Sequence, residues 1–126
     1  MKLSNRQIGA VGVTRVASAL MRLGYSVLTP IEDYSGYDLV AEKRGRFIRI
    51  QVKTTSKTEG DKTYYRFMTS GGCDSKAAYT KDKIDILVAW AMDEDLFWVL
   101  KPTELRGPTK KLYPKTGSSW RILSDL

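Results

Sequence analysis

The side chains best suited to chemistry in this 126-residue sequence are those of Asp38, Gln51 and Lys53. A carboxylate and an amide oxygen that lie close together can share one hard cation such as Mg²⁺, at roughly 2.0–2.1 Å. The backbone carbonyl of Val52 could add a third oxygen. The Lys53 ammonium could orient or deprotonate an attacking water, or stabilise charge on a phosphate during its transfer. These residue types therefore indicate metal-assisted hydrolysis of a phosphate ester.

A predicted β-hairpin would bring the three side chains together. Residues 37–43 and 46–53 have strand patterns and are joined by an Arg-Gly dipeptide, a typical two-residue turn. The register set by this turn places Asp38 directly opposite Gln51, with their Cβ atoms roughly 4.5–5.5 Å apart on one face. Lys53 shares that face, about 6.6 Å further along the strand.

The second strand of the hairpin alternates in character. Its apolar side chains, which would face a core, are Ile48, Ile50 and Val52. The opposite row, which is polar except for its first member, is Phe47, Arg49, Gln51 and Lys53. A polar row is unusual on a central strand unless that face has a function. The alternative is that Asp38 and Lys53 form a surface ion pair and Gln51 is an ordinary exposed residue.

Composition excludes several kinds of chemistry and favours a nucleic-acid partner. The sequence contains no histidine and a single cysteine, Cys73, so imidazole-based catalysis, a cysteine zinc cluster and an internal disulfide are excluded. The net charge is +7, from 21 basic and 14 acidic residues. The basic residues concentrate in 43–57 and 101–126, as expected of a nucleic-acid binder. An inert basic surface is the alternative.

The remaining pattern predicts one α/β domain over 1–126, built on a mixed sheet with an N-terminal helix. Ser4 and Gln7 form a capping box before a helix that runs to residue 23 and ends at Gly24. Gly9 and Gly12 would let that helix approach the sheet closely. Further strands are expected at 25–28, 63–68, 86–92 and 96–100. The strand at 63–68 is expected to join the two hairpin strands as the third strand of that group. A turn or a short helix is expected at 81–85, and an irregular tail from residue 102 with a possible short helix at 103–105.

No apolar run is long enough to span a membrane, and the N-terminus is amphipathic rather than an apolar signal core. We therefore expect a cytoplasmic protein with no membrane partner.

The hairpin residues resemble the PD-(D/E)XK nuclease superfamily. The resemblance rests on Tyr37-Asp38-Leu39-Val40, then a short hairpin, then Ile50-Gln51-Val52-Lys53-Thr54-Thr55. Glutamine in place of the usual acid is similar to the branch that contains group I intron-encoded homing endonucleases. Further similar residues are Gly9, Gly12, Gly24-Tyr25, Pro30, Tyr79-Thr80-Lys81-Asp82 and Asp85. The resemblance covers about residues 7–102 and leaves the basic tail 103–126 uncovered.

The resemblance implies a restriction-endonuclease-like mixed β-sheet core and hydrolysis of double-stranded DNA with Mg²⁺, for which Mn²⁺ can substitute. Asp38 would be an acidic metal ligand, Gln51 a neutral ligand and Lys53 the catalytic lysine. One domain holds one active site, so cutting both strands implies a homo-oligomer, a dimer or tetramer. A homing enzyme, a junction resolvase and a restriction-type enzyme all fit this fold, and Gln51 favours the homing type.

One position departs from the resemblance. The branch usually has a glutamate after the second glycine of the first helix, where this sequence has Val13. The chain could cleave slowly with one metal ion, recruit Glu32 or Asp33, or be a catalytically inactive DNA-binding module. A basic protein–protein adaptor is a further alternative.

Residues next to the predicted active strand are candidates for DNA contacts, because hydroxyl and basic side chains bind phosphates. These candidates are Arg49, Thr54, Thr55 and Lys57. The basic tail could form a DNA-contacting arm or remain solvated; its charged residues include Lys110, Lys111, Lys115 and Arg121.

Overall fold

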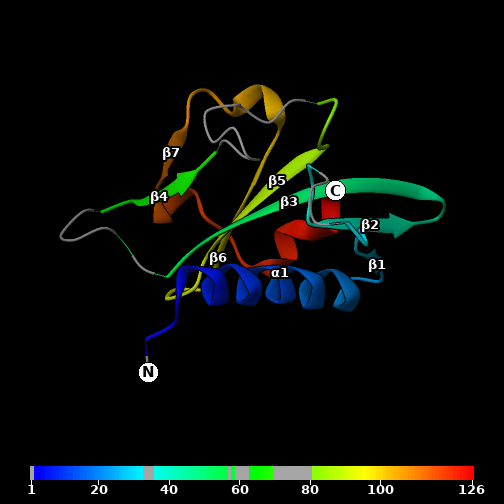
Figure 1. The fold of residues 1–126 in the computed structure, drawn as a ribbon, viewed down its shortest axis with the longest axis horizontal. Helices are drawn as coiled ribbons and strands as arrows, with labels where there is room; N and C mark the ends of the chain where they lie inside the picture. The colour runs from blue at the N-terminus through cyan, green and yellow to red at the C-terminus, as the bar shows by residue number, and fades with distance from the viewer. Residues whose placement is uncertain (1, 33–35, 57, 59–62, 70–80) are drawn as a thin grey trace.

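A five-stranded mixed sheet with one long helix along it forms the centre of the protein (Figure 1). The computed structural model describes residues 2–32, 36–56, 58, 63–69 and 81–126. The sheet order is β1-β2-β3-β5-β6, with β3 and β5 parallel and the other neighbours antiparallel. The predicted α/β fold, a mixed sheet with an N-terminal flanking helix, is confirmed. The elements are α1 (Asn5–Arg22), β1 (Ser26–Leu28), β2 (Leu39–Lys43), β3 (Arg46–Thr55), β4 (Tyr65–Met68), β5 (Ile86–Ala91), β6 (Leu96–Leu100), η1 (Pro102–Glu104), β7 (Thr109–Leu112), η2 (Pro114–Thr116) and η3 (Trp120–Asp125).

The predicted caps of α1 are both present. The Gln7 backbone N–H donates to Ser4 Oγ at 3.2 Å, and the Ser4 N–H donates to Gln7 Oε1 at 2.7 Å. The helix therefore begins at Asn5, three residues before its first apolar residue. Beyond its end, Gly24 has φ +91°, a conformation that glycine adopts without steric cost.

The two glycines of α1 differ in what they touch. A Cβ on Gly12 would overlap the side-chain oxygen of Thr54 on β3, so the helix and the sheet are closest there. A Cβ on Gly9 would meet no described atom within 4 Å. The prediction of close approach is confirmed at Gly12 and wrong at Gly9 for the described part of the chain.

The hairpin has the predicted register. Pairs run from Lys43 with Arg46 to Leu39 with Ile50. The turn residues Arg44 and Gly45 have φ of 55° and 79°, the combination that a type I′ turn requires. Strand β3 is central, because β2 lies on one side of it and β5 on the other.

Each face of the sheet has its own apolar core. The α1 face buries a cluster that includes Val16, Leu20, Ile48, Ile50, Val52, Trp90, Phe97 and Leu123. The other face buries a second cluster that includes Tyr65, Phe67, Ile84, Leu87, Trp98, Leu100, Leu105 and Leu112. The second cluster lies under the antiparallel pair β4–β7.

This pairing corrects two predictions. Strand β4 does not join the hairpin strands but pairs with β7 in a separate two-stranded sheet. The tail is not simply an irregular arm, because Leu105, Leu112 and Leu123 are buried in the two cores. The Thr-Lys-Lys-Leu sequence of β7 carries one buried side chain in four, too weak an alternation to predict a strand.

The expected turn at 81–85 is present. In the part of the chain that the structure describes, no helix is both long and apolar enough to cross a bilayer.

Candidate active site

Asp38 lies where β2 separates from β3. Its backbone N–H donates at 2.9 Å to the carbonyl of Ile50, which is already the strand partner of Leu39, so the regular register ends here. Its carboxylate then accepts a hydrogen bond from the Val52 N–H at 2.9 Å. The carboxylate thus occupies the place that a carbonyl of the neighbouring strand would otherwise fill. Both ends of the residue are fixed by β3, so the position of the carboxylate is set by the hairpin.

Gln51 and Lys53 belong to the polar face of β3. Ile48, Ile50 and Val52 are at most 7% exposed and face α1, whereas the residues between them point the other way. Gln51 and Lys53 are half-buried, on the same side as Leu87 and Ala89 of β5. The predicted alternation of β3 is confirmed. The paired register ends at Leu39 and Ile50, so the direct pairing of Asp38 with Gln51 stays a prediction.

Burial acts on both charges of the site. It raises the pKa of Asp38 above the ordinary value of 3.8, against the Val52 hydrogen bond and the Lys53 charge, which lower it. It lowers the pKa of Lys53 from 10.5, against the charge of Asp38, which raises it. A solvated surface pair would show no such desolvation. Both charged groups are therefore partly withdrawn from water.

Arg49, on the same face, is engaged within the protein. Its guanidinium donates to the carbonyls of Asp82 at 2.7 Å and Lys81 at 2.9 Å, and forms a salt bridge with Asp85 at 3.2 Å. Its backbone N–H also donates to the Asp85 carboxylate at 2.7 Å, and the Asp85 N–H donates to the Arg49 carbonyl at 2.9 Å. We therefore do not keep Arg49 among the proposed DNA contacts.

The loop that Arg49 contacts also packs beside Gly36, two residues before Asp38. A Cβ on Gly36 would lie 3.0 Å from the Cβ of Lys83, so the segment that leads into Asp38 runs closely along residues 81–85. Arg49 and Asp85 thus hold the segment that lies against Gly36, two residues before Asp38. Sequence reasoning missed this role, because Asp85 meets Arg49 only through the parallel pairing of β3 with β5.

The other predicted DNA contacts fall in different places. The Thr54 hydroxyl is buried against Gly12 with no hydrogen-bond partner among the described residues, so it does not reach a phosphate. Thr55 is half-buried, and its carbonyl accepts from the Met92 N–H at 2.8 Å. Lys57 lies outside the described residues.

The alternative acids and the helix position can also be placed. Val13 is partly buried and packs against the core on the α1 face, as its helical position predicts. Glu32 is exposed in the segment before Asp38, and Asp33 lies outside the described residues.

The candidate ligands are all oxygen atoms, as a hard cation prefers, but only one of them carries a negative charge. Asp38, Gln51 and the Val52 carbonyl offer oxygen ligands, which Mg²⁺ prefers. Nowhere in the described ranges do three or more His, Cys, Asp or Glu side chains gather. A single carboxylate among neutral oxygens predicts weak retention of a divalent ion.

Comparisons with known proteins identify the family and the fold of the chain. A family model described as PD-(D/E)XK endonuclease matches residues 3–115. Protein 5.3 of Escherichia phage T7 is 33% identical over 114 residues, which are 90% of this chain and 94% of that protein. The structure of a bacterial homing endonuclease, I-Ssp6803I, matches with a TM-score of 0.75 and 21% identity, over 98% of this chain and 94% of that one. The likeness extends past residue 102, so most of the tail belongs to the shared fold.

Proposed function

Because this chain belongs to the PD-(D/E)XK endonuclease family, we propose that it is a homing-type endonuclease that hydrolyses phosphodiester bonds in double-stranded DNA. The observation that carries the proposal is the half-buried arrangement of Asp38, held by the Val52 N–H, beside Lys53. The homing type is supported by Gln51 and by the fold of a bacterial homing endonuclease.

In this proposal the residues of β3 act on the scissile phosphate directly. The Lys53 ammonium lies in a partly desolvated site, where a charge interacts more strongly with a phosphate than it would in water. It orients the attacking water and stabilises the negative charge that grows on the phosphate oxygens as the bond to the leaving oxygen breaks. Asp38 holds the Lys53 charge in place and keeps the hairpin in register.

A divalent ion such as Mg²⁺ would be held by the Asp38 carboxylate, the Gln51 side-chain oxygen and the Val52 carbonyl. When bound, it would supply polarisation of the phosphate and a lowered pKa for a water molecule. Mn²⁺ would use the same oxygen donors.

We further propose that the active form is a homo-oligomer, a dimer or tetramer, because one domain offers one active site and a duplex has two strands. Light scattering of the purified protein, with and without duplex DNA, measures this assembly state. A monomer that makes double-strand breaks under single-turnover conditions would contradict it.

Nicking of supercoiled plasmid in Mg²⁺ and in Mn²⁺ tests the proposal. The protein is compared with Lys53→Ala, which removes the ammonium, and with Val13→Glu, which restores the acid usual in this branch. We expect nicking by the unmodified chain, faster nicking by Val13→Glu, and none by Lys53→Ala.

The other outcomes are equally informative. Nicking by Val13→Glu alone would identify the chain as an inactive DNA-binding form of the fold. Absence of nicking by all three, together with absence of salt-sensitive DNA binding, would overturn the nuclease proposal.

A further inference from the structure

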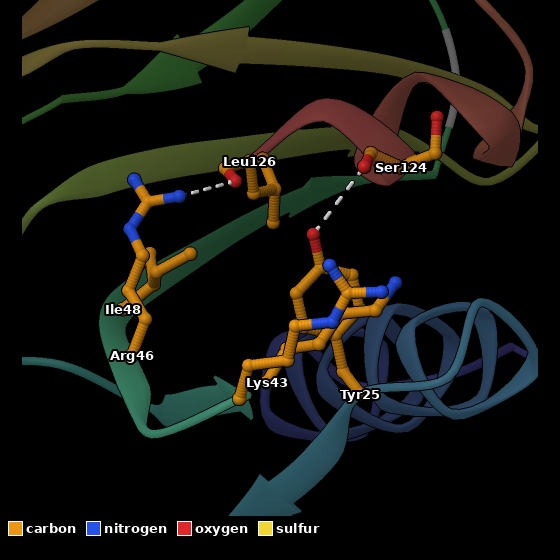
Figure 2. Close-up of a pocket in the computed structure, with 7 residues that line it drawn as sticks. Tyr25, Lys43, Arg46, Ile48, Ser124 and Leu126 are labelled. Carbon is orange, nitrogen blue, oxygen red and sulfur yellow. Dashed lines mark hydrogen bonds between the residues drawn. The ribbon is translucent and has the colours of Figure 1, made fainter.

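A basic pocket lies at the end of β3 that is remote from Lys53. It is about 430 Å³ in volume and opens between the hairpin turn, the start of β1 and the last residues of the chain (Figure 2). Arg46 is seven residues before Lys53, so the pocket is about 23 Å from the proposed active site along the strand. Its lining residues are Tyr25, Lys43, Arg44, Arg46, Ile48, Ser124 and Leu126.

Three of the lining residues are cations, and the described lining includes no carboxylate side chain. Lys43 and Arg46 are paired directly opposite each other in the hairpin. Like charges in such a pair repel each other and destabilise the hairpin. The nearby Glu42 carboxylate accepts from the Gly45 N–H at 3.3 Å and does not line the pocket. A bound anion would neutralise this concentration of charge.

Two of the cations are held in position by the protein. Lys43 Nζ donates to the Leu23 carbonyl at 3.0 Å and lies 4.7 Å from the centre of the Tyr25 ring. Figure 2 shows Arg46 reaching across the pocket to Leu126, whose main-chain oxygen accepts from Nη1 at 2.9 Å. An ammonium has three N–H donors and a guanidinium five, so these single bonds do not exhaust them.

The ends of the neighbouring elements form the far wall. The Tyr25 hydroxyl donates to the Ser124 carbonyl at 3.4 Å, which ties η3 to the start of β1 (Figure 2). The apolar core of the α1 face stops at Ile48, and the cations continue the same face of the hairpin beyond it. The pocket therefore continues the α1 face of the hairpin beyond the apolar core.

We propose that this pocket binds a phosphate group. Guanidinium groups match the geometry of phosphate oxygens, and the ammonium adds a point charge. If the phosphate belongs to DNA, which rests on the proposed function, the pocket would hold the backbone away from the scissile bond, because it continues the α1 face and Lys53 lies on the other face of β3. A free phosphate would use the same donors.

Two measurements on the full chain test the pocket and separate the two sources. The test variant is Arg44→Gln/Arg46→Gln, which leaves the contacts of Lys43 intact. The control is Lys101→Gln/Arg106→Gln, which removes the same charge from exposed positions outside the pocket. Duplex DNA binding is measured over a salt series, and backbone amide NMR shifts are followed during titration with inorganic phosphate. Circular dichroism verifies that each variant is folded.

We expect the slope of log affinity against log salt to fall by about 0.9 for each DNA phosphate that the pocket variant no longer neutralises, beyond the change in the control. That result assigns the pocket to the DNA backbone. A second pair of results would assign the pocket to a free phosphate. Phosphate would then shift the hairpin amides of the unmodified chain but not those of the variant, and the salt slope of the variant would equal that of the control. The absence of both effects would overturn the pocket proposal. Failure of the unmodified chain to bind DNA would count against the proposed function, while the phosphate titration would still decide the pocket.

Discussion

The two ends of β3 carry basic residues in opposite surroundings. At one end, Arg44 and Arg46 are exposed, and Arg46 donates to the main-chain oxygen of Leu126 across an open pocket. At the other end, Lys53 is half-buried, and desolvation lowers its pKa beside the charge of Asp38. An exposed cation attracts a phosphate with little cost to the fold, whereas a desolvated one has a stronger effect on charge in a transition state. One end of the strand is therefore suited to binding and the other to reaction.

The largest expected effect separates these two tasks. Lys53→Ala should lower the single-turnover cleavage rate at saturating protein by about 10²–10³-fold, because one group that stabilises the transition state is removed. Its DNA affinity should change little. The pocket variant Arg44→Gln/Arg46→Gln should lower the DNA affinity and change the cleavage rate at saturating protein little. Rapid-quench cleavage and filter binding measure the two quantities, and parallel losses in both variants would contradict the division.

The next effect concerns the loop support of the reactive end. Arg49→Ala leaves Asp85 and two loop carbonyls without their partner. We expect cleavage to fall by about 10–100-fold, with a higher half-saturating Mg²⁺ concentration, as for groups that orient ligands from behind. Arg49→Lys should recover only part of the rate, because an ammonium cannot reproduce the planar fork. An unchanged Mg²⁺ dependence in Arg49→Ala would show that the contacts of Arg49 with residues 81–85 only stabilise the fold.

The close contact between α1 and the reactive end can be tested with the two helix glycines. Gly12→Ala should destabilise the protein by about 1–3 kcal/mol, because its methyl group would overlap the Thr54 side chain. Gly9→Ala should instead stabilise it by about 0.5–1 kcal/mol through helix propensity. Urea unfolding measures both. Gly12→Ala/Thr54→Ala should regain much of the stability, and equal effects of the two glycine substitutions would contradict the packing described.

The smallest expected effect is on the free energy of unfolding, when the charged residues at either end of β3 are replaced. The folded state raises the pKa of Asp38 and lowers that of Lys53, so both charged forms cost stability near pH 7. The Asp38 cost is absent below its unfolded pKa and appears as pH rises through its folded value. The Lys53 cost is absent above its unfolded pKa and appears as pH falls through its folded value.

Asp38→Asn/Lys53→Met should therefore raise the free energy of unfolding at pH 7 by about 1 kcal/mol or more. The pocket variant should stay within about 0.5 kcal/mol of the unmodified chain, as exposed substitutions usually do. Thermal unfolding at pH 7 measures the difference, and a less stable Asp38–Lys53 double variant would contradict the desolvation argument.

Local patterns allowed the reactive hairpin to be predicted from the sequence. The Arg-Gly turn and the alternation of Ile48, Ile50 and Val52 are determined by neighbours along the chain, and both indicated the observed register. Ser4 and Gln7 predicted the helix start for the same reason.

Contacts between distant segments could not be predicted in this way. Arg49 meets Asp85 only because β3 and β5 are parallel neighbours, and β4 meets β7 across more than forty residues. The basic pocket likewise needs the end of the chain to fold back on the hairpin. In each case the pairing depends on the packing of the whole sheet, which no short pattern contains.

The role of Asp38 is the central claim, and its isosteric replacement tests that claim most directly. Asp38→Asn keeps an oxygen that can accept from the Val52 N–H while it removes the negative charge. Nicking by the unmodified chain and by Asp38→Asn is compared in Mg²⁺ at equal DNA occupancy. We expect nicks with the aspartate and none with the asparagine, with salt-sensitive DNA binding retained. Equal nicking by both proteins would contradict this role for Asp38.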